Sequence, residues 1–233
     1  MGVKIKSALG SVTLDAENIA SNTTVTVPAG GGTLATTDDI PAAGGLKSQQ
    51  VFTSSGTWTK PAGINTVKVY VTGGGGGGVH SANSFKSSGG GGGTAIKIID
   101  VSSISSVSVT IGTGGYPIIY SAAAGDGGTS SFGSYCSATG GKGGKSTPDW
   151  RGGEYGVGTG GDINLYGNSG SITDGNNTAQ AGGGSFWGGG GNGSEAVISG
   201  ENGFYGGGGG GCDNTDTSAG YGGSGICVVE EYA

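Results

Sequence analysis

The chain has 233 residues, and 60 of them are glycine, about 26% against an average near 7%. Nine glycines precede residue 67 and the other 51 lie within residues 73–225. This glycine content excludes α-helices of normal length in residues 73–225, because glycine costs about 0.5–1 kcal/mol per helical residue relative to alanine. Charged residues make up 11% and the net charge is −6, which argues against a charge-rich disordered chain and against nucleic-acid binding.

Residues 1–40 are rich in Val, Thr and Ser in an alternating pattern that is typical of β-strands. A strand is expected at 25–27, and shorter ones are expected around Ile5 and Val12. Such short strands bury little surface within one chain, so we expect copies of the chain to intertwine here. Residues 41–48, PAAGGLKS, are predicted to be a linker.

Residues 49–233 are expected to form one glycine-rich domain built on a few strands. In the first of them Val67, Val69 and Val71 alternate with polar or aromatic residues, which predicts a strand with one buried face. Trp58 precedes this strand and is expected in its core. The strands predict a small antiparallel sheet or sandwich, with the glycine-rich segments as long excursions from it. The four expected strands lie at 67–72, 94–101, 106–111 and 226–232.

Uninterrupted glycine runs lie at 73–78, 89–93, 188–191 and 206–211. Interspersed Trp, Tyr, Phe and Asn argue against a flexible Gly-Ser linker. The ordered alternative is a bundle of polyglycine II helices, which are left-handed, extended and three residues per turn. They make no internal hydrogen bonds, so neighbouring helices must satisfy their amides and carbonyls. A helix surrounded on all sides then needs glycine at every position.

An outer helix of such a bundle needs glycine on two of its three faces only. GGKGGK at 140–145 shows this pattern and predicts that Lys142 and Lys145 lie one turn apart on the open edge. Three other stretches are expected to follow this outer-helix pattern less strictly: GDGGT at 125–129, GTGGD at 158–162 and GYGGS at 220–224. The fold class is therefore predicted as all-β, a short fibrous β shaft followed by a small antiparallel β domain with a bundle of polyglycine II helices.

In this architecture the segments poor in glycine become loops between one extended helix and the next. A rigid scaffold that presents aromatic and polar loops is a common design for a recognition surface. The predicted loops are 79–88, 116–124, 145–155, 162–180, 185–187, 194–205 and 212–221.

Several stretches resemble a known family. The entry VFTSSGTWTKPAGINTVKVYVTGGGGGG, then GGGGGTAIKIIDV and SVSVTIGTGG, and the closing GGGGGGCDNTDTSAGYGGSGICVVEEY are similar to the Gly-rich C-terminal domain of bacteriophage tail fibres. Residues 10–41 resemble the shaft segment that often precedes tail-fibre tips. The resemblance extends to the Gly-rich distal adhesins of T-even-like phages, in which the loops between polyglycine helices set host range. It implies a homotrimeric fibre in the virion, joined to an upstream tail-fibre or baseplate protein, whose distal end binds a bacterial outer-membrane protein or surface polysaccharide.

Receptor-binding candidates are the large aromatic residues of the predicted loops and the one arginine of the chain. Trp, Tyr and Arg dominate binding hot spots because they offer large contact areas at small entropic cost. The same side chains could also pack beneath their loops. The candidates are Trp150, Arg151, Tyr155, Phe186, Trp187, Phe204, Tyr205 and Tyr221.

No catalytic, cofactor or metal site is predicted, so the protein is not expected to be an enzyme. His80 is the one histidine, which is too few for a triad or a histidine-rich metal site, and it is expected to be an exposed loop residue. Glu230 and Glu231 would point to opposite faces of a strand and make an unconvincing carboxylate pair. The alternatives are a structural glycine-rich coat or ice-binding protein, or a fibre-borne polysaccharide depolymerase.

Three cysteines without a CxxC spacing, Cys136, Cys212 and Cys227, are expected to be small buried hydrophobes in a protein made in a reducing cytosol. No apolar signal-peptide segment follows Met1. The protein is therefore expected to be made in the host cytoplasm and assembled into the virion without a conventional secretion signal.

Overall fold

The computed structural model confirms an all-β protein and divides the chain into two units, Met1–Ala43 and Gly44–Ala233. The strand expected at 25–27 lies outside the described residues. No helix is found in the described part of the chain that is long and apolar enough to cross a membrane. The structure describes residues 3–7, 10–14, 45–80, 87–119, 123–146, 151–172, 180–194, 199–212 and 218–233.

In the first unit, β1 (Val3–Ser7) and β2 (Gly10–Leu14) pair in antiparallel fashion. Ile5 lies opposite Val12, so the two short strands expected around these residues are confirmed. A two-stranded hairpin of this length is marginally stable in water on its own.

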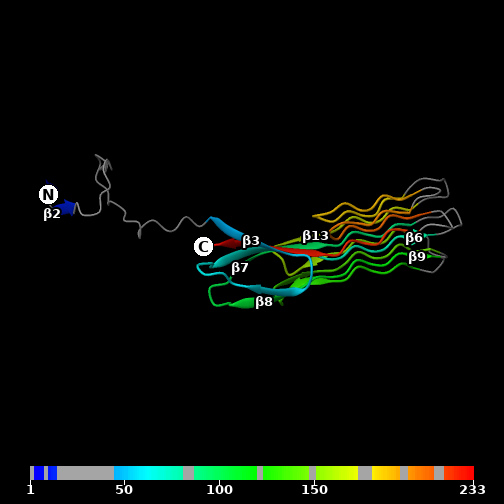
Figure 1. Ribbon diagram of the computed structural model, residues 1–233, viewed down its shortest axis with the longest axis horizontal. Helices are drawn as coiled ribbons and strands as arrows, with labels where there is room; N and C mark the ends of the chain where they lie inside the picture. Colours follow the sequence, from blue (N-terminus) through cyan, green and yellow to red (C-terminus); the bar gives the residue numbers. More distant parts are fainter. Residues whose placement is uncertain are drawn as a thin grey trace. The chain divides into compact units, whose positions relative to one another are not determined.

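The second unit begins as two five-stranded antiparallel sheets that pack face to face (Figure 1). The first sheet has the order β12 (Gly158–Thr159), β11 (Cys136–Ala138), β10 (Ser130–Phe132), β8 (Ser106–Thr110) and β4 (Gly56–Thr59). The second has the order β13 (Ile163–Leu165), β7 (Thr94–Asp100), β5 (Thr66–Thr72), β14 (Ile226–Tyr232) and β3 (Leu46–Phe52). Strand β3 begins at Leu46, within the stretch 41–48 that the sequence suggested was a linker.

The core lies between the two sheets and is small and aliphatic. Val67, Val69 and Val71 are fully buried there, as their alternation predicted, and so is Trp58, whose ring packs against Phe132 with 5.8 Å between centroids. All three cysteines of the chain are buried, as expected. Burial raises the pKa of the Cys136 thiol to about 11.

One carboxylate is enclosed in this otherwise apolar sandwich. Glu231 is fully buried, while its neighbour Glu230 faces the other side of β14, as their adjacency predicted. The Glu231 carboxylate accepts hydrogen bonds from Trp58 Nε1 at 2.7 Å, from Gln50 Nε2 at 2.6 Å and from Ser48 Oγ. Glu231 therefore ties the edge strand β3, and the indole on β4, to the C-terminal strand.

From the sandwich, extended glycine segments run side by side in a bundle (Figure 1). The segment Gly73–Gly78 continues directly from β5, and its hydrogen bonds repeat every third residue, which is the period of a polyglycine II helix. The amides of Gly73 and Gly76 donate to the carbonyls of Gly93 and Gly90, those of Gly74 and Gly77 to Gly128 and Gly125, and those of Gly75 and Gly78 to Gly223 and Gly220.

The carbonyls of the same segment accept from three further segments, represented by Gly115, Gly141 and Gly209. Gly73–Gly78 thus has three donor-side and three acceptor-side neighbours and is enclosed by six segments. A Cβ built on Gly75 would collide with the backbone carbonyl of Gly207. The runs 89–93 and 206–211 are bonded and enclosed in the same way. The expectation that an enclosed helix needs glycine throughout is confirmed for these runs.

The run 188–191 differs because it lies on the surface. Gly189 is exposed, and a Cβ added there would meet nothing within 4 Å. Its glycines are therefore not all required by close packing, which the sequence pattern did not reveal.

Two outer segments have glycine on two of their three faces, as predicted. In GGKGGK the four glycines are buried while Lys142 and Lys145 are exposed, as predicted. In GYGGS, Gly220, Gly222 and Gly223 are buried and Tyr221 is exposed, which confirms a second case.

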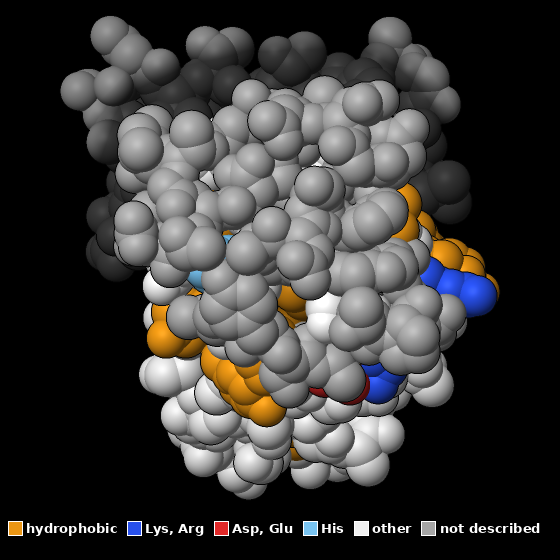
Figure 2. Space-filling model, turned by 90° about the vertical axis from the view of Figure 1, so that its right-hand side faces the viewer, with side chains coloured by type: hydrophobic (Ala, Val, Ile, Leu, Met, Phe, Trp, Pro, Cys, Tyr) orange, Lys and Arg blue, Asp and Glu red, His pale blue; other side chains and the backbone are white. Residues whose placement is uncertain are grey.

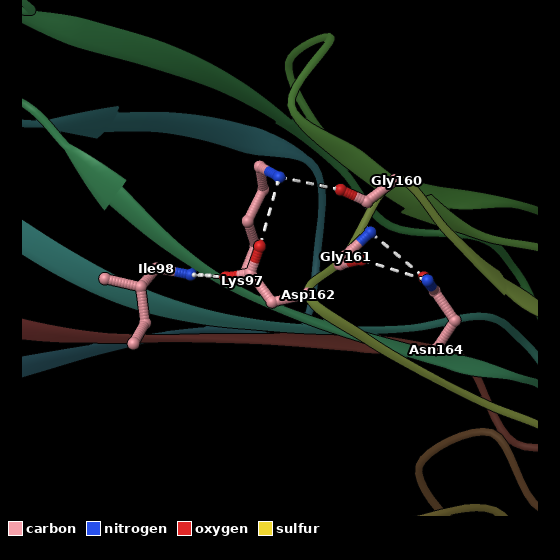
Figure 3. A network of polar contacts seen from close by, with 6 residues as sticks. All are labelled: Lys97, Ile98, Gly160, Gly161, Asp162 and Asn164. Atoms are coloured by element: carbon pink, nitrogen blue, oxygen red, sulfur yellow. Dashed lines mark hydrogen bonds and ion pairs between the residues drawn. The ribbon is translucent and has the colours of Figure 1, made fainter.

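GTGGD at 158–162 is not a looser polyglycine helix, and this expectation was wrong. Its first two residues form β12, and residues 160–162 form the turn to β13, with Gly160 at φ 74°. Asp162 closes the turn onto β7 by accepting from the Ile98 amide at 2.8 Å and pairing with Lys97 at 3.5 Å (Figure 3). These contacts hold the Asp162 pKa below its usual value, the hydrogen bond from the Ile98 amide contributing most.

Candidate functional site

The end of the bundle away from the sandwich is called here the distal end (Figure 1). Six stretches that fall within predicted loops lie outside the described residues, and the described residues that border them meet at this end. Backbone bridges join the borders to one another: Val79 with Ile118, His80 with Cys212, Ser194 with Cys212, Ser87 with Ile172, Ala123 with Lys145, and Lys145 with Arg151. The six stretches are 81–86, 120–122, 147–150, 173–179, 195–198 and 213–217.

This convergence follows from the bundle itself. Each segment spans the bundle once and is fixed in register by hydrogen bonds to its neighbours on several sides. Chain reversals must therefore occur at its two ends, where one end is occupied by the sheets. The described residues that border the six stretches are thus gathered at one end of the bundle, although they are far apart in sequence.

Of the predicted binding residues, Arg151 lies at the distal end. Its carbonyl accepts from the Lys145 amide at 2.9 Å, and its side chain is exposed. Trp150 lies outside the described residues.

Phe186 and Trp187 lie at the opposite end of the bundle, beside the sandwich. Both contact the Tyr70 ring on β5, with centroid distances of 6.1 and 5.5 Å. They remain partly exposed. The sequence did not distinguish a turn at the sandwich end from a turn at the distal end, because both consist of polar and aromatic residues between glycines.

Phe204 and Tyr221 border a shallow groove of about 650 Å³ on the side of the bundle, between two parallel outer segments. Tyr205 belongs to a turn near the sandwich. Its φ is 40° and its carbonyl accepts from Ser185 Oγ at 2.6 Å. The cost of this backbone conformation, on the order of 1 kcal/mol or more, is offset by the surrounding contacts.

Tyr155 lies on another flank, where its ring meets the edge of Tyr166 with 5.2 Å between centroids. Tyr166 was not among the predicted residues, although it is more exposed than Tyr155. The seven candidates that the structure describes are therefore spread over the distal end, two flanks and the sandwich end, and do not form one patch.

His80 is fully buried, so the expectation of an exposed loop residue was wrong. It belongs to β6 (Val79–His80), which pairs in parallel with β9 (Ile118–Ile119). The extended segment Gly73–Gly78 continues into Val79 and His80 near the distal end. Neighbouring segments enclose these two larger residues as well.

A small charged pocket of about 320 Å³ opens close to the distal end. Lys142 and Asp126 form a salt bridge of 2.8 Å across it, and Asp126 also accepts from the Gly143 amide at 3.0 Å. Burial alone would raise the Asp126 pKa, but these two hydrogen bonds outweigh it, and the pKa lies below its usual value. Its lining residues are Ala123, Asp126, Lys142, Gly143, Lys145, Arg151, Gly152 and Glu154.

Among the described residues, no three His, Cys, Asp or Glu side chains are grouped as metal ligands would be. A search among curated proteins found no match. The family model of a glycine-rich domain matches residues 48–232, a range that covers the sandwich and the polyglycine bundle together. The chain therefore belongs to the family of glycine-rich domains.

Proposed function

We propose that the protein is a phage tail-fibre tip adhesin that recognises a receptor on the host bacterial surface through the loops between its polyglycine helices. One observation carries the proposal: the described residues that border six predicted loops meet at one end of a bundle whose inner segments are hydrogen-bonded on all sides. Such a bundle is a stiff platform, and stiffness lowers the entropic cost of binding through displayed loops. The resemblance to phage tail fibres supplies the biological setting, a virion fibre attached to an upstream tail-fibre or baseplate protein.

The receptor is proposed to be an outer-membrane protein or a surface polysaccharide. Either could be contacted by aromatic and polar side chains at the distal end, because rigid aromatic rings stack on sugars as well as on protein loops. No catalytic step is proposed.

The test is adsorption of labelled full-length protein to host cells. Replacing residues 147–150, which include Trp150, with Gly-Ser-Gly-Ser is expected to lower adsorption about tenfold or more, since the loss of one aromatic hot spot is worth about 2 kcal/mol. The matched control replaces Ser102 and Ser103, in the turn between β7 and β8, with glycines. Unchanged adsorption of the first variant, or equal losses in both, would contradict the assignment of the distal end as the contact face.

We also propose that the chain is a homotrimer held by its N-terminal unit. The β1–β2 hairpin has only two strands, and a hairpin of this kind is not stable in water without further packing. Light scattering should give the full chain a mass of about 66 kDa, three times the 22.1 kDa of one chain, while residues 44–233, which have their own core, should be monomeric. A monomeric full chain would overturn the proposal.

A further inference from the structure

The charged pocket near the distal end concentrates all the positive charge of the second half of the chain. Residues 112–233 contain eleven acidic residues and three basic ones, Lys142, Lys145 and Arg151. All three basic residues line this pocket. The net negative charge of this half would favour a neutral or cationic partner. The pocket is a local exception because its lining carries all three basic residues.

The backbone fixes these cations in place. Two outer segments run antiparallel, so the Lys142 amide donates to the Glu154 carbonyl at 2.8 Å, and the Lys145 amide to the Arg151 carbonyl at 2.9 Å. Lys145 therefore lies directly opposite Arg151 on the neighbouring segment. Lys145 and Arg151 therefore bring two positive charges to the same pocket, where one anionic group could contact both.

The lining also contains two acidic residues, Asp126 and Glu154. Asp126 is engaged by Lys142 and the Gly143 amide. Glu154 lies on the segment of Arg151 and is exposed, where its carboxylate can accept hydrogen bonds from hydroxyl groups. A pocket with paired cations beside a carboxylate matches a ligand that carries one anionic group and several hydroxyls.

The pocket volume of about 320 Å³ lies at the lower end of the roughly 300–1,000 Å³ found for small-ligand sites. Figure 2 looks onto the distal end and shows Lys or Arg side chains in blue toward one side of it, some of them next to an acidic side chain in red. The volume of the pocket is therefore compatible with a small ligand.

We propose that this pocket binds an anionic saccharide, with Lys145 and Arg151 contacting its phosphate or carboxylate group and Glu154 accepting from its hydroxyls. Arginine suits this role because its planar donors match both kinds of oxyanion. The inference rests on the proposed function, because it names the chemistry of the receptor that the distal end would contact.

The first test is calorimetric titration of the full-length protein at constant ionic strength with glucose 6-phosphate, glucuronate and glucose as probes. At least one anionic sugar is expected to bind about tenfold more tightly than glucose, and the comparison of the two distinguishes phosphate from carboxylate recognition. The double variant Lys145→Gln/Arg151→Gln should lose this preference. The control Lys47→Gln/Lys68→Gln removes two charges from the sandwich and should keep it.

Equal binding of glucose and both anionic sugars, no binding of any, or an unchanged preference in the Lys145→Gln/Arg151→Gln variant would overturn the proposal. Adsorption to host cells separates this failure from failure of the proposed function. If the wild-type protein and this variant adsorb equally well, the pocket is not the receptor site but the adhesin function stands. If the wild-type protein prefers an anionic sugar but adsorbs to no host cell, the pocket stands and the adhesin function fails.

Discussion

Replacing Gly75 with alanine is expected to lower the melting temperature of the glycine-rich unit by about 10–15 °C. The new methyl group would collide with the carbonyl of Gly207 in an adjacent segment, and overpacking of this kind costs about 1–3 kcal/mol. The hydrogen bonds to Gly223 and from Gly115 would also be strained, at about 1 kcal/mol each. A total of about 3–5 kcal/mol corresponds to this shift at roughly 2–4 °C per kcal/mol.

Gly189→Ala is the matched control, since it makes the same substitution in another glycine run. A Cβ at Gly189 meets nothing within 4 Å, so the melting temperature should stay the same or rise slightly, because alanine loses less backbone entropy on folding. Differential scanning calorimetry measures both variants. Equal melting temperatures for the two variants would show that Gly75 is not enclosed, and the stiff platform would be lost as an explanation.

Replacing Glu231 with alanine should destabilise the sandwich by about 3 kcal/mol. The substitution removes the acceptor of the buried Trp58 indole N–H, and a buried donor left without an acceptor costs about 1–3 kcal/mol. It also removes the hydrogen bond from the part-buried Gln50 amide, worth about 1 kcal/mol. Denaturant unfolding followed by tryptophan fluorescence measures the loss.

Glu230→Ala is the control at the next position of the same strand. Glu230 faces the outside, where it accepts from Tyr232 at 2.9 Å, and exposed substitutions usually change stability by no more than about 0.5 kcal/mol. A Glu231→Ala variant as stable as the Glu230→Ala variant would show that the Trp58 and Gln50 contacts contribute nothing to stability.

The polyglycine architecture could be predicted from sequence because its rule is local. Whether a segment is enclosed or outer is encoded in the spacing of its glycines, and this is why the exposure of Lys142 and Lys145 was predicted correctly. Strand alternation predicted β5 for the same reason. Whether a side chain must point inward or outward restricts its residue type, whichever segment it packs against.

The predictions that were wrong depend on which segments lie next to one another in the fold. The spacing of glycines along the chain does not encode this. His80 has the same local pattern as an exposed loop, but neighbouring segments enclose it. The stretch 158–162 has the pattern of an outer helix, but it forms strand β12 and the turn to β13. Phe186 lies beside the sandwich because its turn is at that end of the bundle, where its ring contacts Tyr70. The charged pocket was missed because its lining comes from residues 123–126, 142–145 and 151–154, which become adjacent only in the folded bundle.

The three-residue hydrogen-bond repeat restricts how such a protein can evolve. Inside the bundle, inserting or deleting one or two residues would rotate every later position by a third or two thirds of a turn and place side chains where only hydrogen fits. Changes in whole triplets keep the phase. The predicted loops are free of this rule, so under the proposed adhesin function host specificity would diversify there by mutation, insertion or recombination while the bundle is inherited unchanged.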